Sequence, residues 1–227
     1  MNTHKEQWES GKQHEIDFWT EWFETGGLQW KEEYKNRLDE NLPFPEFLIE
    51  YLPDRPEITV LDVGAGPLTL LGKVLPGRKL TITAVDALAD IYDKIMERCH
   101  IVPLVRTQYC EAERLSEKFP AGSFDLVYMQ NALDHSYDPM EGIKQMLHVV
   151  KNDCCVFLSH ATNEAERENY SGFHQWNFCM EGDKFIIWNK DARIDVASEL
   201  SGYAEVTVRG DDAWNQVMMK KIDFQAP

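Results

Sequence analysis

The feature that most constrains this chain is an alternation of short apolar strands with helical segments, which begins at a strand running into Gly64-Ala65-Gly66. Strands of this kind are buried on both faces, and strands separated by helices pair in parallel within a layered α/β fold. The pattern predicts strands over Thr59–Val63, Leu80–Val85, Leu104–Tyr109, Phe124–Met129 and Cys154–Ser159, and helices over Leu68–Val74, Ala89–Arg98 and Pro139–Val150.

The regions on either side of this core follow other patterns. Residues 6–51 read as helices, with Ile16, Trp19 and Trp22 at helical spacing and a break at Gly26-Gly27. Past the core, Trp176–Phe178 and Lys184–Trp188 predict a hairpin, followed by a helix over Ile194–Leu200 and closing strands over Tyr203–Val208 and Val217–Ile222. We therefore expect one domain, with a helical cap (1–55), a core (56–160), an inserted segment (161–190) and a closing helix and strands (191–227).

Two acids flank the glycine turn. Ligands of open α/β sheets bind beyond the carboxyl ends of the strands, where glycines let the backbone approach closely. The turn lacks the third glycine of a dinucleotide-binding loop, because Thr69 occupies that position. Asp62, two residues before Gly64, suits a ligand with an ammonium group. Asp86, which ends the second strand, is placed to accept from both hydroxyls of a ribose. The structural alternatives are a tight turn without ligand and a helix N-cap at Asp86.

Further along the chain, Cys110-Glu111-Ala112-Glu113 follows the third strand and Ser123–Val127 begins the fourth. With LDVGAG, AVD, EAERL, FPAGSFDLVYMQNALDH and DPMEGIKQMLHVVKND, the stretch from Val60 to Leu158 resembles class I S-adenosylmethionine-dependent methyltransferases of the methyltransferase-11 type. The resemblance implies a Rossmann-like sandwich with a mostly parallel seven-stranded sheet and an antiparallel last strand. The resemblance also implies S-adenosylmethionine as the cofactor.

The same resemblance implies the cofactor-binding residues. Asp62, Gly64 and Gly66 are expected at the methionine end, Asp86 and Ala87 at the ribose, Glu111 and Ala112 at the adenine, and Gln130 and Asn131 at the methionine moiety. By helical spacing, Tyr34 and Arg37 share a face and could bind the cofactor carboxylate. The alternative is that Tyr34 is core and Arg37 a solvated charge.

Three histidines follow strand ends or lie in the inserted segment, and each is a candidate base. His135 follows the fourth strand, His160 follows the fifth, and His174 lies in an aromatic stretch. Each has a structural alternative: His135 packs over the cofactor, His160 is a buried histidine under the hairpin, and His174 only shapes a lid. Their spacing lacks the i, i+4 pair of a helical metal site, so we expect no metal.

Composition narrows the class of substrate. The net charge of −16 argues against nucleic acid, and no apolar run is long enough to span a membrane. Five cysteines without a secretion signal favour reduced thiols and a cytoplasmic location. The substrate side is expected to take a small molecule; the sequence does not indicate the oligomeric state.

The segments NALDHSYDP, HATNEAERENY and SGFHQWNF resemble bacterial methyltransferases found among capsule and surface-polysaccharide genes. We therefore expect O-methylation of a small polar acceptor, such as a sugar or a phosphorylated or nucleotide-linked precursor. The alternatives are N-methylation of an amine, a nicotinamide-dependent oxidoreductase, and a non-catalytic partner protein with this fold. Thr69 argues against the oxidoreductase, and the intact cofactor motif argues against the non-catalytic protein.

Overall fold

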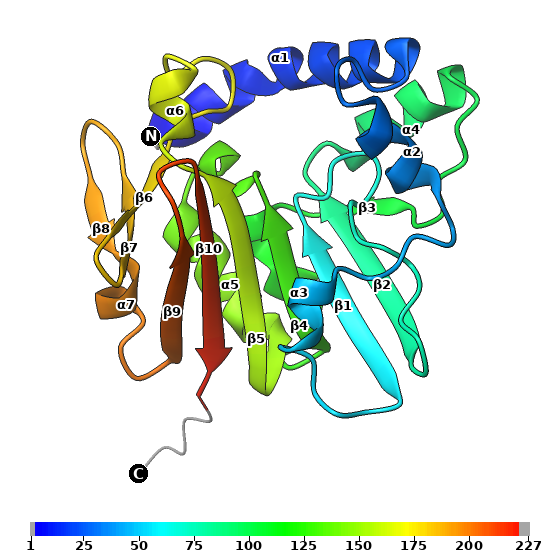
Figure 1. The fold of residues 1–227 in the computed structure, drawn as a ribbon. Coiled ribbons are helices and arrows are strands. Elements are labelled where there is room, and N and C mark those ends of the chain that lie inside the picture. Colours follow the sequence, from blue (N-terminus) through cyan, green and yellow to red (C-terminus); the bar gives the residue numbers. More distant parts are fainter. Residues whose placement is uncertain (1–2, 223–227) are drawn as a thin grey trace.

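A mostly parallel seven-stranded sheet forms the centre of the protein, whose computed structural model describes residues 3–222. The strand order is β3-β2-β1-β4-β5-β10-β9, and β10 runs antiparallel to the other six strands of this sheet (Figure 1). This order confirms the predicted fold class. The strands of the sheet are β1 (Glu57–Val63), β2 (Lys79–Asp86), β3 (Thr107–Tyr109), β4 (Phe124–Gln130), β5 (Val150–Ala161), β9 (Ala204–Gly210) and β10 (Trp214–Lys221).

Helix α1 (Thr3–Thr25) lies across the edge of the sheet where the parallel strands end (Figure 1). It packs on α4, and Trp19 and Trp22, which the helical spacing placed on one face, are buried in the hydrophobic cluster around this contact. The helices are α2 (Lys31–Leu38), α3 (Glu46–Ile49), α4 (Ala89–Arg98), α5 (Pro139–Val149), α6 (Glu164–Arg167) and α7 (Val196–Glu199), with 3-10 turns η1 (Ala112–Glu117) and η2 (Leu133–His135).

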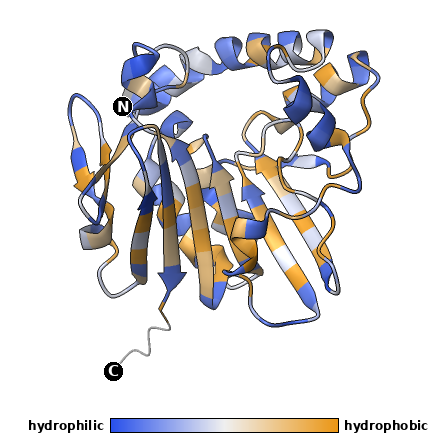
Figure 2. Cartoon of the chain, in the orientation of Figure 1, coloured by the Kyte–Doolittle hydropathy of each residue, from blue (hydrophilic) through white to orange (hydrophobic). Residues whose placement is uncertain are grey.

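The two faces of the sheet belong to different hydrophobic clusters, as the alternation of side chains along a strand requires. On one face, Leu61, Val127 and Val156 pack with α5 and the inserted segment. On the other face, Val60 and Leu126 pack with α3. Figure 2 shows hydrophobic residues following the central strands, whereas α2 is mainly hydrophilic. The apolar strands therefore form the hydrophobic core, which fixes the positions of their carboxyl ends.

The helix predicted over Leu68–Val74 is wrong, because residues 67–78 form turns and bends. Gly72 packs so tightly on the preceding chain that a Cβ there would lie 1.8 Å from the Pro43 carbonyl oxygen. Val74 also forms a parallel bridge with Pro43, and Phe44 donates its N–H to the Val74 carbonyl at 2.8 Å. These backbone bonds replace the helical ones, so no helix follows the glycine turn.

The predicted hairpin forms, and it is larger than the sequence indicated. Strands β6 (Asn177–Glu181) and β7 (Lys184–Trp188) pair antiparallel, and β8 (Arg193–Asp195) extends them to a three-stranded sheet. The inserted segment thus continues past the boundary at residue 190.

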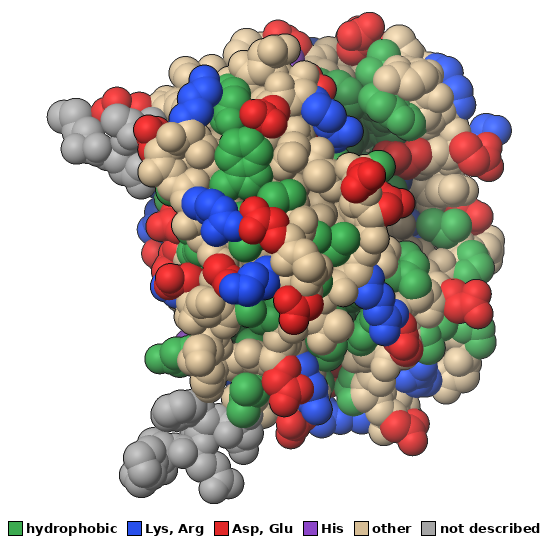
Figure 3. Space-filling view, turned by 60° about the vertical axis from the view of Figure 1, so that its left-hand side comes forward, with side chains coloured by type: hydrophobic (Ala, Val, Ile, Leu, Met, Phe, Trp, Pro, Cys, Tyr) green, Lys and Arg blue, Asp and Glu red, His purple; other side chains and the backbone are tan. Residues whose placement is uncertain are grey.

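The described surface carries charges of both signs. Figure 3 shows acidic and basic side chains interspersed over one face of the molecule. No helix between residues 3 and 222 combines the length and apolar character needed to cross a bilayer. All five cysteines are free thiols.

Candidate functional site

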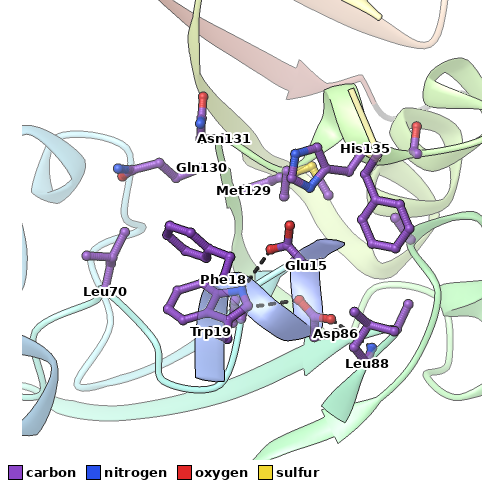
Figure 4. Close-up of a pocket in the computed structure, with 18 of the residues that line it drawn as sticks. Glu15, Phe18, Trp19, Leu70, Asp86, Leu88, Met129, Gln130, Asn131 and His135 are labelled. Atoms are coloured by element: carbon purple, nitrogen blue, oxygen red, sulfur yellow. Dashed lines mark hydrogen bonds between the residues drawn. The ribbon is translucent and has the colours of Figure 1, made fainter. Parts of the chain in front are cut away.

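A cavity of about 740 Å³ lies between α1 and the carboxyl edge of the sheet. This volume is within the range of about 300–1,000 Å³ that is usual for small-molecule sites. Figure 4 shows Glu15, Trp19 and Asp86 together in one part of the cavity and Gln130, Asn131 and His135 in another. The cavity therefore joins the glycine turn to the end of β4 and to the inserted segment.

The glycine turn forms a wall of the cavity and needs glycine at both positions. Gly64 and Gly66 have φ of +65° and +64°, a region that other residues adopt at a cost. A Cβ on Gly64 would lie 2.5 Å from the Ala132 Cβ, and one on Gly66 would lie 2.9 Å from the Trp19 ring. The turn is thus packed against the end of β4 on one side and against α1 on the other.

The two acids that flank the turn are partly or fully buried beside it. Asp86 accepts from the Gly66 N–H at 3.0 Å and from the Leu88 N–H at 2.8 Å, and burial raises its pKa to about 6. Asp62 accepts from the Thr69 hydroxyl at 2.5 Å. Burial raises the pKa of Asp62 to about 7, and the Thr69 bond opposes that rise. A cation placed between these carboxyls would stabilise their ionised forms.

Arg37 lines the cavity, but its guanidinium is buried and engaged by the protein itself. It pairs with Glu33 at 2.9 Å and donates to the carbonyls of Leu68 and Ala65. Arg37 is therefore not a solvated surface charge, as the alternative held, and its guanidinium is not free to pair with a ligand. Its hydrogen bonds connect α2 to the glycine turn and to the segment that follows it. Tyr34 does not line the cavity and packs on Trp22, with ring centroids 5.0 Å apart, as the core alternative held.

The residues after β3 form a hydrogen-bonded wall. Glu111 lines the cavity and accepts from the hydroxyls of Tyr137 at 2.8 Å and Tyr109 at 3.1 Å. Glu113 accepts from the backbone N–H groups of Tyr137 and Asp138, and burial raises its pKa to about 7. Ala112 and Ala87 also line the cavity, so the predicted neighbours of the adenosyl group share one space.

Gln130 and Asn131 line the cavity where β4 ends. Asn131 has φ of +47°, and its side-chain oxygen accepts from the Ala161 N–H at 3.1 Å. The Tyr128 hydroxyl donates to the side chain of Gln130. Both amides are therefore oriented by the sheet beneath them.

His135 and His174 meet at the far end of the cavity, although 39 positions separate them in the printed sequence. Their ring centroids are 4.6 Å apart, and behind them lies Asp134, whose side chain is 1% exposed. His174 Nδ1 lies 2.6 Å from Asp134 Oδ2, and His135 Nε2 lies 3.5 Å from the same oxygen. Burial alone lowers the pKa of His174, but the bond to Asp134 and its charge outweigh burial and raise it.

His160 is placed differently from the other two histidines. It is buried under the hairpin, its ring centroid 5.0 Å from that of Phe178, and it does not line the cavity. Burial lowers its pKa to about 4. This position agrees with the structural alternative and does not support contact with a substrate.

Comparison with known proteins gives a family match for the central part of the chain. Residues 61–158 match the model of a family described as a methyltransferase domain. The match covers 98 of the 227 residues, less than half of the chain. It supports S-adenosylmethionine as the cofactor, as the resemblance implied.

A curated relative of the methyltransferase domain is a ubiquinone biosynthesis O-methyltransferase from Pseudomonas paraeruginosa, 25% identical over 152 residues. The match covers 61% of this chain and 65% of that protein, less than two thirds of its length.

Two solved structures show the same fold. A methyltransferase from Haloferax volcanii, in complex with the Trm112 methyltransferase activator, is 13% identical, with 89% of this chain and 97% of that one covered and a TM-score of 0.52. A protein of Methanococcus maripaludis assigned as S-adenosyl-L-methionine-dependent is 14% identical, with 80% and 84% covered and a TM-score of 0.51.

The cavity fits S-adenosylmethionine in size and in charge. Gly64 and Gly66 line the cavity of about 740 Å³, and Asp62 and Asp86 supply negative charge beside them. The cofactor bears a positive sulfonium and an ammonium group, so these acids suit it.

Sequence reasoning missed two contributors to the site, Trp19 and Glu15. Trp19, with Glu15 hydrogen-bonded to its Nε1 at 2.7 Å, reads as one apolar face of a helix, and that periodicity does not separate core from cavity. The sequence marks Asp134 as the neighbour of His135, and the structure adds that His174 lies beside it as well.

Proposed function

We propose that this protein is an S-adenosylmethionine-dependent O-methyltransferase that acts on a small polar acceptor. The observation that carries the proposal is one cavity with two chemically distinct ends. The glycine turn with Asp62 and Asp86 lines one end, and His135 and His174 line the other. The acidic end suits the cofactor, and the histidine end suits a hydroxyl that must lose a proton.

At the cofactor end, the chain's own groups bind and orient. Asp86 is already fixed by two backbone N–H bonds, and its remaining lone pairs accept from the ribose hydroxyls. Asp62, Gln130 and Asn131 line the same cavity and would hold the methionine moiety, with Asp62 supplying a charge for its amino group. Glu111, oriented by two tyrosine hydroxyls, accepts from the adenine amino group.

When bound, S-adenosylmethionine supplies a methyl group that passes to the acceptor oxygen while the carbon–sulfur bond breaks and its electron pair stays on sulfur. The chain contributes by aligning the acceptor and excluding water. Residues of the inserted segment, among them Glu164, Phe173 and His174, line the acceptor end together with Trp214. Their polar and aromatic groups favour an acceptor with both hydroxyls and an apolar face.

The choice of oxygen over nitrogen rests on the histidines, since an amine needs less help to lose its proton. The name of the Pseudomonas relative, an O-methyltransferase, supports the same choice. The relatives named above carry no capsule or polysaccharide name. A sugar or nucleotide-linked acceptor is therefore supported by the chain's own segments alone, and amine methylation stays the alternative.

The test begins with S-adenosylhomocysteine, titrated into the purified protein by calorimetry. Saturable binding with one site per chain is expected, and no binding contradicts the proposal. Methyl transfer from labelled cofactor is then measured on phenols, sugars and amines. His135→Ala is expected to keep the affinity for S-adenosylhomocysteine and to slow methyl transfer to hydroxyls. His148 is exposed on α5, and His148→Ala should leave the affinity and the transfer rate unchanged. Transfer to amines alone would favour the alternative.

A further inference from the structure

Three side chains at the acceptor end hold possible metal-ligand atoms close together. Asp134, His135 and His174 each place one such atom within 4.8 Å of the other two. Two of them come from η2 and the third from the inserted segment, so the fold brings together what the sequence spacing does not. Two imidazoles and one carboxylate are the ligand set of several divalent transition-metal sites.

A second observation at the same place is a concentration of buried polar atoms without a hydrogen bond. Within residues 3–222, eight buried side-chain nitrogen or oxygen atoms lack a hydrogen bond. All of them belong to six neighbouring residues: Asp134, His135, Ser136, His160, Gln175 and Asn215. Buried polar groups are nearly always bonded, so a cluster of exceptions points to a bound ion or ordered water.

The charges at this point favour an ion. The Asp134 side chain is 1% exposed, its Oδ1 is among the unpartnered atoms, and within the described chain its ion-pair partners are His135 and His174, with no lysine or arginine among them. A buried carboxylate needs a positive partner. The next acid, Glu164, also lines the cavity and adds negative charge at the same end.

We propose that Asp134, His135 and His174 bind a divalent transition-metal ion, which replaces the expectation of no metal that the sequence spacing gave. Metal–ligand bonds of about 2.1 Å place adjacent ligand atoms about 3.0–3.5 Å apart. The 3.5 Å between His135 Nε2 and Asp134 Oδ2 is within that range. The 2.6 Å between His174 Nδ1 and Asp134 lengthens when Nδ1 gives up its proton to bind the ion.

This inference deepens the proposed O-methylation and rests on it. Three protein ligands leave positions open, and these face the cavity because His135 and His174 line it. An acceptor hydroxyl bound there has a lowered pKa and loses its proton to solvent. Its oxygen then forms the bond to the methyl carbon as the carbon–sulfur bond breaks. The substrate class is thus a hydroxyl compound that can bind a metal ion.

The test uses the full chain stripped of metal by a chelator. Co²⁺ is titrated and followed by its visible absorption, and Zn²⁺ is titrated by calorimetry. We expect one ion per chain, and at least about tenfold weaker binding in Asp134→Asn and in His135→Asn, since even outer partners of a metal site contribute this much. His148→Asn is the matched control and keeps full affinity.

Three outcomes decide the matter. Absence of Co²⁺ and Zn²⁺ binding in the wild-type protein would overturn the metal site and leave ordered water at the cluster. Binding that persists unchanged in both folded variants would overturn it as well. S-adenosylhomocysteine binding to the same metal-free protein separates the two proposals: if it is retained without metal uptake, only the metal site fails; if it is absent, the methyltransferase proposal fails.

Discussion

Replacing Asp86 by alanine tests the cofactor site most directly. The carboxylate ends β2 and is held by the N–H groups of Gly66 and Leu88, so it presents fixed lone pairs to the cavity. Hydrogen bonds to a charged group contribute about 1.5–3 kcal/mol each, so losing two ribose bonds costs about 3–6 kcal/mol. At about 1.4 kcal/mol per tenfold, Asp86→Ala is expected to weaken S-adenosylhomocysteine binding about 100-fold to 10,000-fold.

The assay is calorimetric titration of wild-type protein, Asp86→Ala and Asp90→Ala, with circular dichroism to show that each variant is folded. Asp90 is an exposed acid in the first turn of α4, so its removal changes the net charge equally and leaves the site intact. Asp90→Ala is expected to bind like the wild type. Equal affinity in folded Asp86→Ala would refute the ribose assignment and the reasoning from strand position.

Three further predictions test the surroundings of the turn. Gly66→Ala and Gly77→Ala both force alanine to positive φ, so each should lower the free energy of unfolding by about 1–2 kcal/mol in thermal unfolding. Only the new Cβ of Gly66→Ala meets a side chain, so only this variant should weaken S-adenosylhomocysteine binding, by roughly tenfold or more. Equal binding by the two variants would contradict this. The pKa of Asp62 is about 7 in the folded protein and about 3.9 in the unfolded chain. The contribution of this group to the free energy of unfolding is therefore fully present below pH ~4 and is lost as the pH rises to ~7. Asp62→Asn removes that titration and should gain up to about 4 kcal/mol relative to the wild type over this range in urea unfolding; parallel pH profiles would be evidence against the shift. Arg37→Met leaves buried carbonyl acceptors unpaired and should lower the free energy of unfolding by about 1–3 kcal/mol, whereas exposed Lys35→Met changes it by about 0.5 kcal/mol or less. Similar losses in both variants would show that the buried contacts contribute little.

The sequence predicted the sheet well because the apolar pattern of each strand lies within a few consecutive residues. A run such as Thr59–Val63 contains its own apolar pattern, and the structure places a strand there, extended by two residues. The segment over Leu68–Val74 failed for a non-local reason. Its helical spacing was real, but backbone bonds to residues 42–44 replaced the helix, and nothing within the segment reveals them.

The site shows the same division. Asp62, Asp86 and Gln130 could be placed from their positions at strand ends, and all line the cavity. Tyr34 could not, because helical spacing shows a shared face and not what the face meets. His174 was a candidate, but its contact with Asp134 depends on the path of the inserted segment, which periodicity does not encode.

The irregular path of residues 67–78 has an electrical consequence. In dinucleotide-binding folds, a helix begins behind the glycine turn and aims the positive end of its dipole at a diphosphate. Here no helix begins there, so that attraction for anions is missing. Two acids, Asp62 and Asp86, flank the turn, and the nearby Arg37 is engaged by Glu33 and by backbone carbonyls. The backbone route itself thus selects against phosphates and in favour of an onium ligand.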